Sequence, residues 1–322
     1  ENHLSKKYGQ RFKDYRKKYL SNITDGRQQA LNDYPNTVVL ELVNRCNLEC
    51  TMCFQGFRNN AKKHTLDNDL IDKIFKDFQQ NNLSALMLSI SEPLLFKNID
   101  QIFERAKKAN IMDIFLFTNG ILLNEKNIKL ILNSGVTRLF VSIDASTEET
   151  YNKVRIPVSE RLKTNITRLS ELENNIKRFM QLRKEHNKVL PLVRTSFVSL
   201  DKNKHEIEKF KSKWKDVVDS IEVQKEVSIN AYSDLENKKA TIIKNKDYFC
   251  SEPWGQITIY SDGTVTPCCN TFGRNLSVGN IKNHSIKEIW NNEMMKKIRN
   301  DFILNKPNNI CANCINNNSE NI

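Results

Sequence analysis

The sequence predicts an α/β fold in which six strand-helix units form a partial (β/α)6 barrel, followed by a small C-terminal domain of a β-hairpin and helices. Short apolar runs alternate with amphipathic stretches between residues 37 and 225, which is typical of parallel strands with helices packed outside. After residue 225 the pattern changes to a connector rich in asparagine and lysine, and then to a hairpin. We therefore divide the 322 residues into a lead-in (1–36), a barrel (37–225) and a C-terminal domain (226–322).

The lead-in is charged and predicted to be helical, with Pro35 ending the helix before the first apolar run. Its first twenty residues contain no apolar signal core, and no later run is long enough to span a bilayer. The chain has eight cysteines, which without a secretory signal indicate metal ligands rather than disulfides. We expect a cytoplasmic protein with no membrane partner.

Six apolar runs in the barrel region are predicted strands: residues 37–43, 85–90, 113–118, 138–143, 192–198 and 220–224. Helices are predicted after the first three runs, at residues 66–80, 98–109 and 123–135, and a longer helical stretch after the fourth run ends at Glu185. In parallel α/β folds the chemistry lies at the carboxyl ends of the strands. We therefore expect the functional residues directly after these runs.

The C-terminal domain is predicted to begin with a hairpin, WGQITIYSDGTVTPCC, whose turn is Asp262-Gly263. A helix follows, and its apolar positions are expected to pack against that hairpin: Ile286, Ile289, Trp290, Met294 and Ile298.

Three cysteines, Cys46, Cys50 and Cys53, follow the first predicted strand in the run RCNLECTMC. A structural zinc site or an ordinary iron-sulfur cluster takes four protein ligands. Three closely spaced thiolates therefore predict a 4Fe-4S cluster with one iron open to a small molecule. The alternative interpretation is unconnected thiols or a zinc site.

The CxxxCxxC spacing resembles the signature of the radical S-adenosylmethionine (radical SAM) enzymes. In that family SAM chelates the open iron, and one-electron reduction cleaves it to methionine and a 5'-deoxyadenosyl radical that abstracts hydrogen from C-H bonds. The resemblance covers about residues 37 to 225 and implies the open, TIM-like (β/α)6 barrel of the family. It also implies a flavodoxin- or ferredoxin-type electron donor.

The other five cysteines bracket the C-terminal domain: Cys250, Cys268, Cys269, Cys311 and Cys314. Together with DGTVTPC, GNI, IW and the closing CxxC they resemble the SPASM or shorter twitch extension of radical SAM enzymes. The resemblance implies one auxiliary 4Fe-4S cluster, held by Cys250, Cys268, Cys311 and Cys314. Consecutive strand residues point to opposite faces, so Cys268 and Cys269 are not expected to face the same cluster. A structural zinc ribbon is the alternative.

Where the family carries a GGE-type motif that binds the SAM amino group, this chain has SISEPLL. Ile90 and Ser91 replace the two glycines, although isoleucine resists backbone conformations that glycine permits, and Glu92 is retained. The resemblance implies SAM contacts by Met52, Phe54, Ser91, Glu92, Asn119, Ser142, Asp144, Arg155 and Ser196. Among these, Met52 or Phe54 would lie near the adenine, Asn119, Ser142 and Ser196 would bind ribose hydroxyls, and Arg155 would pair with the methionine carboxylate.

Four hypotheses for the function follow. The first is dehydrogenation of a small-molecule alcohol or sugar, with the auxiliary cluster accepting the extra electron. The second is a radical epimerase in which Cys269 returns a hydrogen atom, and the third is maturation of a ribosomally made peptide. The fourth is a non-catalytic iron-sulfur or zinc module that binds nucleic acid.

The net charge of +12 does not distinguish these four hypotheses. Lysines and arginines are spread along the chain and interleaved with acids, which favours a solvated surface over a nucleic-acid-binding stripe. A basic surface also attracts an acidic electron donor or a substrate carrying phosphate.

Overall fold

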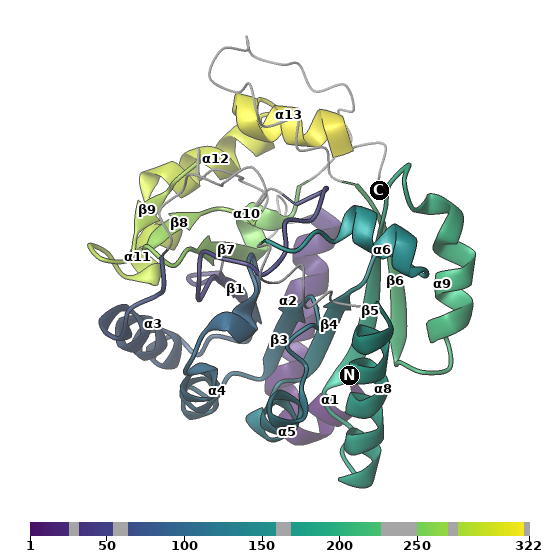
Figure 1. Ribbon diagram of the computed structural model, residues 1–322. Helices are drawn as coiled ribbons and strands as arrows, with labels where there is room; N and C mark the ends of the chain where they lie inside the picture. The colour runs from purple at the N-terminus through teal and green to yellow at the C-terminus, as the bar shows by residue number, and fades with distance from the viewer. Residues whose placement is uncertain (26–31, 54–63, 159–168, 227–249, 270–275, 319–322) are drawn as a thin grey trace.

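The computed structural model describes residues 1–25, 32–53, 64–158, 169–226, 250–269 and 276–318 (Figure 1). Within them, nine strands form one sheet in the order β6-β5-β4-β3-β2-β1-β7-β8-β9. The first six strands are parallel: β1 Thr37–Leu40, β2 Ala85–Leu88, β3 Asp113–Thr118, β4 Arg138–Ser142, β5 Leu192–Ser199 and β6 Ser220–Lys225. They confirm the predicted partial barrel of parallel strands.

Helices alternate with these strands: α3 Asn68–Gln80, α4 Ile99–Lys108, α5 Glu125–Ser134, α6 Glu148–Val154, α8 Leu169–Glu185 and α9 Ile207–Trp214. Two short 3-10 turns, η3 Pro93–Leu95 and η4 Lys204–Glu206, complete the connections. The buried faces of these helices pack in one core with every second strand residue, such as Leu86, Leu116 and Leu139. This alternation follows from the two-residue period of a strand.

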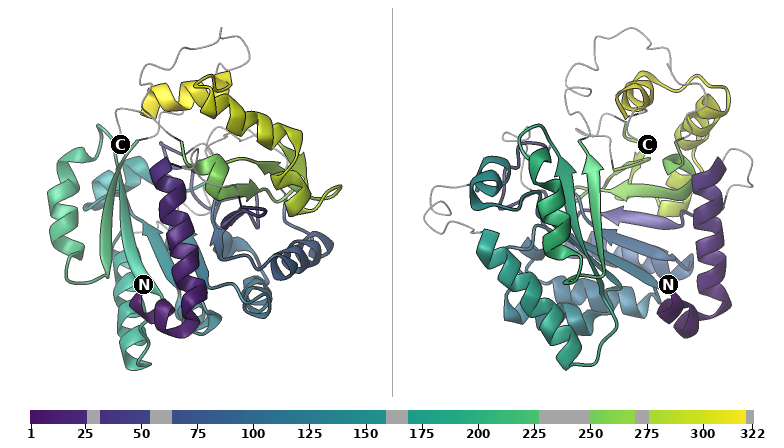
Figure 2. Two further views of the ribbon diagram at one scale, coloured as in Figure 1. Left: turned by 180° about the vertical axis from the view of Figure 1, so that it is seen from behind. Right: turned by 90° about the vertical axis from the view of Figure 1, so that its right-hand side faces the viewer.

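The other face of the sheet is covered by the lead-in helices α1 Asn2–Tyr8 and α2 Gln10–Asp25. Phe12 and Tyr15 are buried with Ala85 and Phe115, whose side chains alternate with those that meet the outer helices. Figure 2 shows the purple helix α2 on one side of the sheet and the helices of the strand-helix units on the other. The lead-in therefore packs inside the curve of the sheet.

The prediction that the lead-in helix ends at Pro35 is wrong, because residues 32–36 are not helical, and within the described residues α2 spans Gln10–Asp25. Residues just before β1 bond to the C-terminal segment instead of forming helical turns. The carbonyl of Asn32 accepts from Trp290 Nε1 at 2.7 Å, and the amide of Asn36 donates to the Gly255 carbonyl at 3.0 Å.

The C-terminal elements are α10 Glu252–Gly255, β7 Gln256–Ile259, β8 Thr264–Thr266, β9 Gly279–Asn280, α11 Ile286–Trp290, α12 Glu293–Ile303 and α13 Asn309–Asn318. Strands β7 and β8 form the predicted antiparallel hairpin, and Gly263 in its turn has φ +90°. Strand β7 also pairs in parallel with β1, so the sheet continues across the two regions. The division at residues 225 and 226 remains a prediction.

The prediction of a single helix over residues 286–298 is wrong, because two helices, α11 and α12, cover this segment. Asn292 caps α12 by accepting a hydrogen bond from the Met295 amide, and this new start shifts the helical phase. Met295 is consequently buried at 0% exposure, whereas Met294, the predicted core residue, is 50% exposed. The other four predicted positions are buried.

No helix among the described residues combines the length and the apolar character needed to cross a membrane.

Candidate functional site

A cavity of about 390 Å³ lies at the carboxyl ends of the parallel strands. Its wall brings together the three cysteines of the first set and most of the residues expected to contact SAM. The lining residues are Cys46, Leu48, Cys50, Met52, Cys53, Ser89, Ile90, Ser91, Glu92, Phe117, Thr118, Asn119, Ser142, Asp144, Arg155, Val198, Gln224 and Cys269.

Strand alternation places these side chains on the inner face of the sheet. On β4, Phe140 lies one layer below Ser142, and on β3 and its end, Phe117 lies one layer below Asn119. Phe117 and Phe140 pack edge to face with centroids 4.8 Å apart, and both also pack against the lead-in cluster. This aromatic layer forms the floor of the cavity.

The cysteine loop is fixed by backbone bonds to the segment that ends α6. The amide of Thr51 donates to the Val154 carbonyl at 3.0 Å, and Glu49 donates to Ile156 at 2.6 Å. Within the loop, the Cys53 amide donates to the Cys50 carbonyl at 2.9 Å. The three thiols are therefore presented to the cavity by a loop with its own hydrogen-bonded framework.

Donors already surround two of these sulfurs. The Leu48 amide lies 3.4 Å from Cys46 Sγ, and Asn119 Nδ2 lies 3.7 Å from the same sulfur. Arg155 Nη1 donates to Cys50 Sγ at 3.4 Å. Burial raises the pKa of Cys46 to about 12, so this thiol would lose its proton when it binds a metal ion.

Three buried polar atoms beside Cys50 have no hydrogen-bond partner: Thr51 Oγ1, Tyr151 Oη and Arg155 Nε. Buried donors of this kind are normally satisfied by the protein, by water or by a ligand. Of these three residues Arg155 lines the cavity, so a sulfur or carboxylate acceptor bound there would satisfy its Nε. The residues present therefore fit a SAM-binding cluster.

Glu92 is 1% exposed and joins the loop after β2 to the end of β3. Its carboxylate accepts from the Asn119 amide at 2.8 Å, from Thr118 Oγ1 at 2.9 Å and from the Leu94 amide at 3.1 Å. Burial raises its pKa to about 7, against the opposing effect of these donors. Glu92 thus organises the cavity wall from within.

Ile90 adopts φ +80°, the left-handed conformation that favours glycine. The chain therefore keeps a glycine-like backbone where the family motif has glycine, although the side chain is β-branched.

Asp144 also has positive φ, at 61°, and its buried carboxylate pairs with Arg155 Nη2. Its other oxygen accepts from the Val198 amide at 2.7 Å. Burial raises the pKa of Asp144, and the Arg155 guanidinium opposes that rise. These contacts make Asp144 a positioning partner of Arg155, and its direct contact with SAM stays a prediction.

Among the described residues, one expected SAM contact, Ser196, does not line the cavity. Ser196 is buried on β5 beside Ser142, and its carbonyl accepts from the Ile143 amide at 3.0 Å. Phe54 lies outside the described residues. The direct roles of all the proposed SAM contacts remain predictions.

Sequence reasoning missed Phe117, Val198 and Gln224 in the cavity wall and Glu41 behind it. Strand alternation was the available signal for the first three, because each precedes or follows a predicted site position by two residues or ends a predicted strand. Glu41 is the one charged residue in the apolar run 37–43, which was the available signal, but its partners are distant along the chain.

The second cysteine set is half-buried, with Cys250 directly before α10 and Cys311 and Cys314 on α13. Burial raises the pKa of Cys250, and nearby Glu252, Cys311 and Cys314 raise it further. Asn308 Nδ2 lies 3.4 Å from Cys311 Sγ. The pKa of Cys268 is likewise raised, first by burial and then by neighbours that include Cys269, Glu252, Cys250 and Cys311. Cys269 also has Glu252 and Cys314 as neighbours and in addition lines the site cavity. All five cysteines thus lie in one region, and the choice between Cys268 and Cys269 as the fourth ligand remains a prediction.

No three His, Cys, Asp or Glu side chains in the described part of the chain are grouped to hold a single metal ion.

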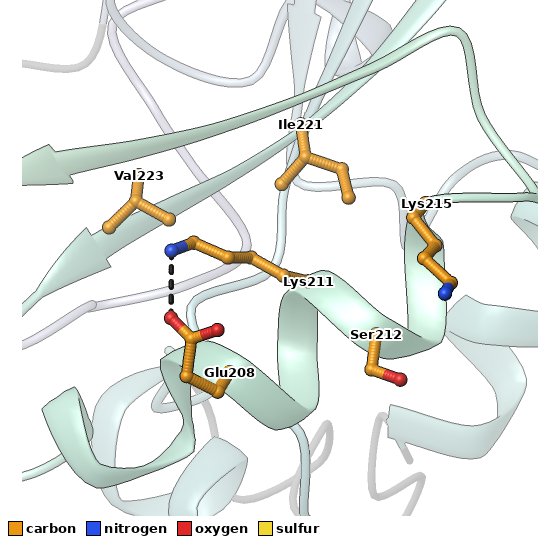
Figure 3. A pocket seen from close by; sticks show the side chains of 6 residues that line it. All are labelled: Glu208, Lys211, Ser212, Lys215, Ile221 and Val223. Carbon is orange, nitrogen blue, oxygen red and sulfur yellow. Dashed lines mark hydrogen bonds and ion pairs between the residues drawn. The ribbon is translucent and has the colours of Figure 1, made fainter.

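A second pocket lies between α9 and the edge strand β6 (Figure 3). Its walls are Ile221 and Val223 on the strand and four residues of the helix side, and Lys211 Nζ pairs with Glu208 at 2.8 Å. It shares no lining residue with the cavity described above and contains none of the cysteines. We therefore place the functional site at the carboxyl ends of the strands.

Comparison with protein-family models gives two matches. Residues 40–188 match the radical SAM superfamily, and residues 250–315 match the SPASM iron-sulfur cluster-binding domain. The two matches enclose all eight cysteines.

Curated relatives include enzymes named GTP 3',8-cyclase. A probable GTP 3',8-cyclase of Methanococcus maripaludis is 35% identical over 117 residues, which span 36% of this chain and 39% of that protein. The chain thus aligns with about two fifths of that relative's length. The GTP 3',8-cyclase of Clostridium botulinum is 24% identical over 299 residues, covering 84% of this chain and 90% of that enzyme.

Solved structures share the fold at low sequence identity. SuiB of Streptococcus suis matches with a TM-score of 0.64 and 14% identity, over 83% of this chain and 68% of SuiB. The enzyme anSMEcpe with bound AdoMet matches with a TM-score of 0.60 and 18% identity, over 82% of this chain and 79% of that chain. BtrN in complex with AdoMet and 2-DOIA matches with a TM-score of 0.52 and 16% identity, over 83% of this chain and 86% of that chain.

Proposed function

Because the chain carries a radical SAM domain followed by a SPASM iron-sulfur domain, we propose that it cleaves SAM reductively and uses the resulting radical to abstract hydrogen from a substrate C-H bond. The observation that carries this proposal is the single cavity that collects Cys46, Cys50 and Cys53 with Glu92 and Arg155. When bound, the SAM-type cluster supplies the electron that releases the 5'-deoxyadenosyl radical.

The protein's own residues have distinct parts in this proposal. The three cysteines would hold the cluster, and the strained loop at Ile90 would present backbone carbonyls to the SAM ammonium. Arg155, held by Asp144, would direct its unpartnered Nε toward an anionic group. Asn119 and Ser142 would bind ribose hydroxyls from the ends of β3 and β4.

For the reaction itself we propose dehydrogenation of a small-molecule alcohol or sugar. The radical takes one hydrogen atom from the carbinol carbon, the hydroxyl proton passes to a base, and the remaining electron leaves the substrate, which gives a carbonyl. The auxiliary cluster, held by Cys250, Cys268, Cys311 and Cys314, would be the electron acceptor. Four protein ligands to this cluster would leave no iron open to the substrate, which supports a role in electron transfer.

The first test measures iron, acid-labile sulfide and SAM cleavage after anaerobic reconstitution. The wild type should contain about eight iron per chain and release 5'-deoxyadenosine, and replacement of Cys46, Cys50 and Cys53 by alanine should leave about four iron and no cleavage. Cys269→Ala is the matched control and should keep about eight iron. Zinc in place of the second cluster would exclude the electron-transfer role. Two intact clusters without SAM cleavage would favour the non-catalytic, nucleic-acid-binding alternative.

The substrate class is tested by a screen in three groups. The curated relatives suggest GTP, and the SuiB structure bound to the precursor peptide SuiA suggests ribosomally made peptides. Cyclitols and sugar alcohols test the dehydrogenation proposal directly. A carbonyl product formed with one 5'-deoxyadenosine per turnover would support dehydrogenation. A modified peptide or rearranged GTP would contradict dehydrogenation and identify the substrate class instead. A flavodoxin- or ferredoxin-type protein is the proposed electron donor.

A second candidate function, epimerisation, is supported by the position of Cys269 in the cavity wall. Its S-H would return a hydrogen atom to the substrate radical, and the thiyl radical left behind would be reduced by one electron from the donor protein and one proton. Cys269→Ala should then abolish epimer formation while 5'-deoxyadenosine release continues. In D2O the wild type would place deuterium at the inverted carbon. Full product formation by the variant, without label, would end this candidate.

A further inference from the structure

Glu41 is a buried carboxylate at the end of β1 for which the proposed reaction has no use. It is 0% exposed, and its amide continues the pairing of β1 with β7 by donating to the Ile259 carbonyl at 2.9 Å. A buried carboxylate is costly unless hydrogen bonds satisfy it. Its acceptor contacts therefore indicate what the residue holds in place.

The two carboxylate oxygens of Glu41 bond to different parts of the molecule. Oε1 accepts from Ser91 Oγ at 3.3 Å, and Oε2 accepts from Ser261 Oγ at 2.9 Å and from the Ser261 amide at 3.0 Å. Ser91 belongs to the loop that walls the cavity, and Ser261 lies in the turn between β7 and β8. One side chain thus joins the cavity loop to the hairpin that leads to Cys268 and Cys269.

The neighbouring backbone explains why the loop needs such a contact. Ile90, directly before Ser91, is in the left-handed region, and a β-branched residue keeps that conformation only where its surroundings impose it. The bond from Ser91 to Glu41 anchors the residue next to this strained position. The hairpin turn thus adds a side-chain contact to a loop that two long backbone bonds also hold, from Ser89 to Leu40 and from Glu92 to Arg45, each at 3.4 Å.

We propose that Glu41 is a positioning residue through which the auxiliary hairpin sets the conformation of the SAM-binding loop at residues 89–92. The inference rests on the proposed function in that this loop contacts SAM. The position of the C-terminal hairpin and the conformation of the loop at residues 89–92 are then coupled through the Glu41 carboxylate.

Asp77 provides a matched control. It is also a buried carboxylate that ties the C-terminal segment to the barrel, because it accepts from the Ile286 amide at 3.0 Å and from Tyr34 Oη at 2.6 Å. It does not line the cavity. A general loosening of the C-terminal region should follow from changes at either carboxylate, whereas loss of loop placement should follow only from changes at Glu41.

The test compares Glu41→Ala, Glu41→Gln, Ser91→Ala and Asp77→Ala in the reconstituted holoenzyme. Two readouts are used: the dissociation constant for SAM, and deuterium uptake of the backbone at residues 89–92 and 260–263 without SAM. Glu41→Ala should weaken SAM binding by about tenfold or more and raise uptake in both segments. Ser91→Ala should raise uptake at 89–92 only, Glu41→Gln should restore most of the affinity, and Asp77→Ala should leave both readouts near wild type.

The inference is overturned if Glu41→Ala binds SAM as tightly as the wild type, if its uptake at 89–92 is unchanged, or if Asp77→Ala reproduces both effects. Failure of the wild type to bind SAM would instead remove the proposed function. The uptake comparison requires no SAM, so it judges Glu41 independently of that outcome. Ser91→Ala keeps the test decisive if the Glu41 variants do not fold.

Discussion

Two residues in the cavity wall, Ile90 and Asp144, have positive φ. Non-glycine residues in this region cost about 1–3 kcal/mol each and cluster at functional sites. Asp144 is held there by Arg155 and by the Val198 amide, and Ile90 directly precedes Ser91, whose hydroxyl donates to Glu41. The other four described non-glycine residues with positive φ are asparagines, which adopt this conformation more readily than isoleucine, and none of them lines the cavity.

Replacing Ile90 with glycine should relieve this strain. We expect Ile90→Gly to raise the free energy of unfolding by about 1 kcal/mol, measured by urea denaturation of the cluster-free protein. The control is Ile121→Gly, at a half-buried residue that does not have positive φ. This substitution should lower the free energy of unfolding by about 1 kcal/mol or more. Equal losses at the two positions would show that Ile90 is not strained.

Glu92 should make stability depend on pH. Burial raises its pKa from 4.5 to about 7, so the folded protein favours the neutral carboxyl. This contribution is fully present below pH 4.5 and is lost as the pH rises through 7, with a slope of at most about 1.4 kcal/mol per pH unit. In cluster-free protein, Glu92→Gln should remove that slope from the curve of unfolding free energy against pH. Parallel curves for wild type and variant would contradict the assignment.

At the scale of single elements, periodicity and turn chemistry predicted the strands closely, and residues 113–118 were predicted with the observed bounds. Two element predictions failed, one because of distant contacts and one because of a local cap. Residues 32–36 are not helical, and the carbonyls of Asn32 and Asp33 bond to the C-terminal helix region. The helix after residue 285 divides because Asn292 caps a new helix by accepting from the Met295 amide. Ser196 and Val198 show the limit at the site: strand alternation places both on the same face of β5, but of the two Val198 alone lines the cavity.

The division between α11 and α12 predicts opposite effects for two adjacent methionines. Met295→Ala should lower the free energy of unfolding by about 2–5 kcal/mol, because it removes a fully buried side chain. Met294→Ala should change it by less than about 0.5 kcal/mol, because that side chain is exposed. Urea denaturation of the two variants measures both values, and the reverse order would restore the uninterrupted helix predicted from the sequence.

At the scale of the whole molecule, one sheet passes from the barrel strands into the C-terminal hairpin through the pairing of β1 with β7. The core cluster likewise contains residues of both regions, among them Ile74, Ile257 and Trp290. A shared sheet and core predict that the two regions unfold together.

The three tryptophans allow this cooperativity to be measured. Trp214 reports on the barrel, whereas Trp254 and Trp290 report on the C-terminal region. In Trp214→Phe, and separately in Trp254→Phe/Trp290→Phe, the urea midpoint by fluorescence should coincide with the midpoint by far-ultraviolet circular dichroism. A separation of the two midpoints in either variant would show that the regions unfold independently.

The lead-in helices restrict the side from which a small molecule can enter the cavity. Phe12 and Tyr15 pack within the curve of the sheet, and Phe117 and Phe140 lie between them and the cavity. Within the described part of the chain, a diffusing molecule is thus blocked from below and reaches the cavity from the rim where the cysteines lie. In the proposed reaction, 5'-deoxyadenosine would leave over the same rim by which SAM enters, so release of the nucleoside would have to precede binding of the next SAM molecule.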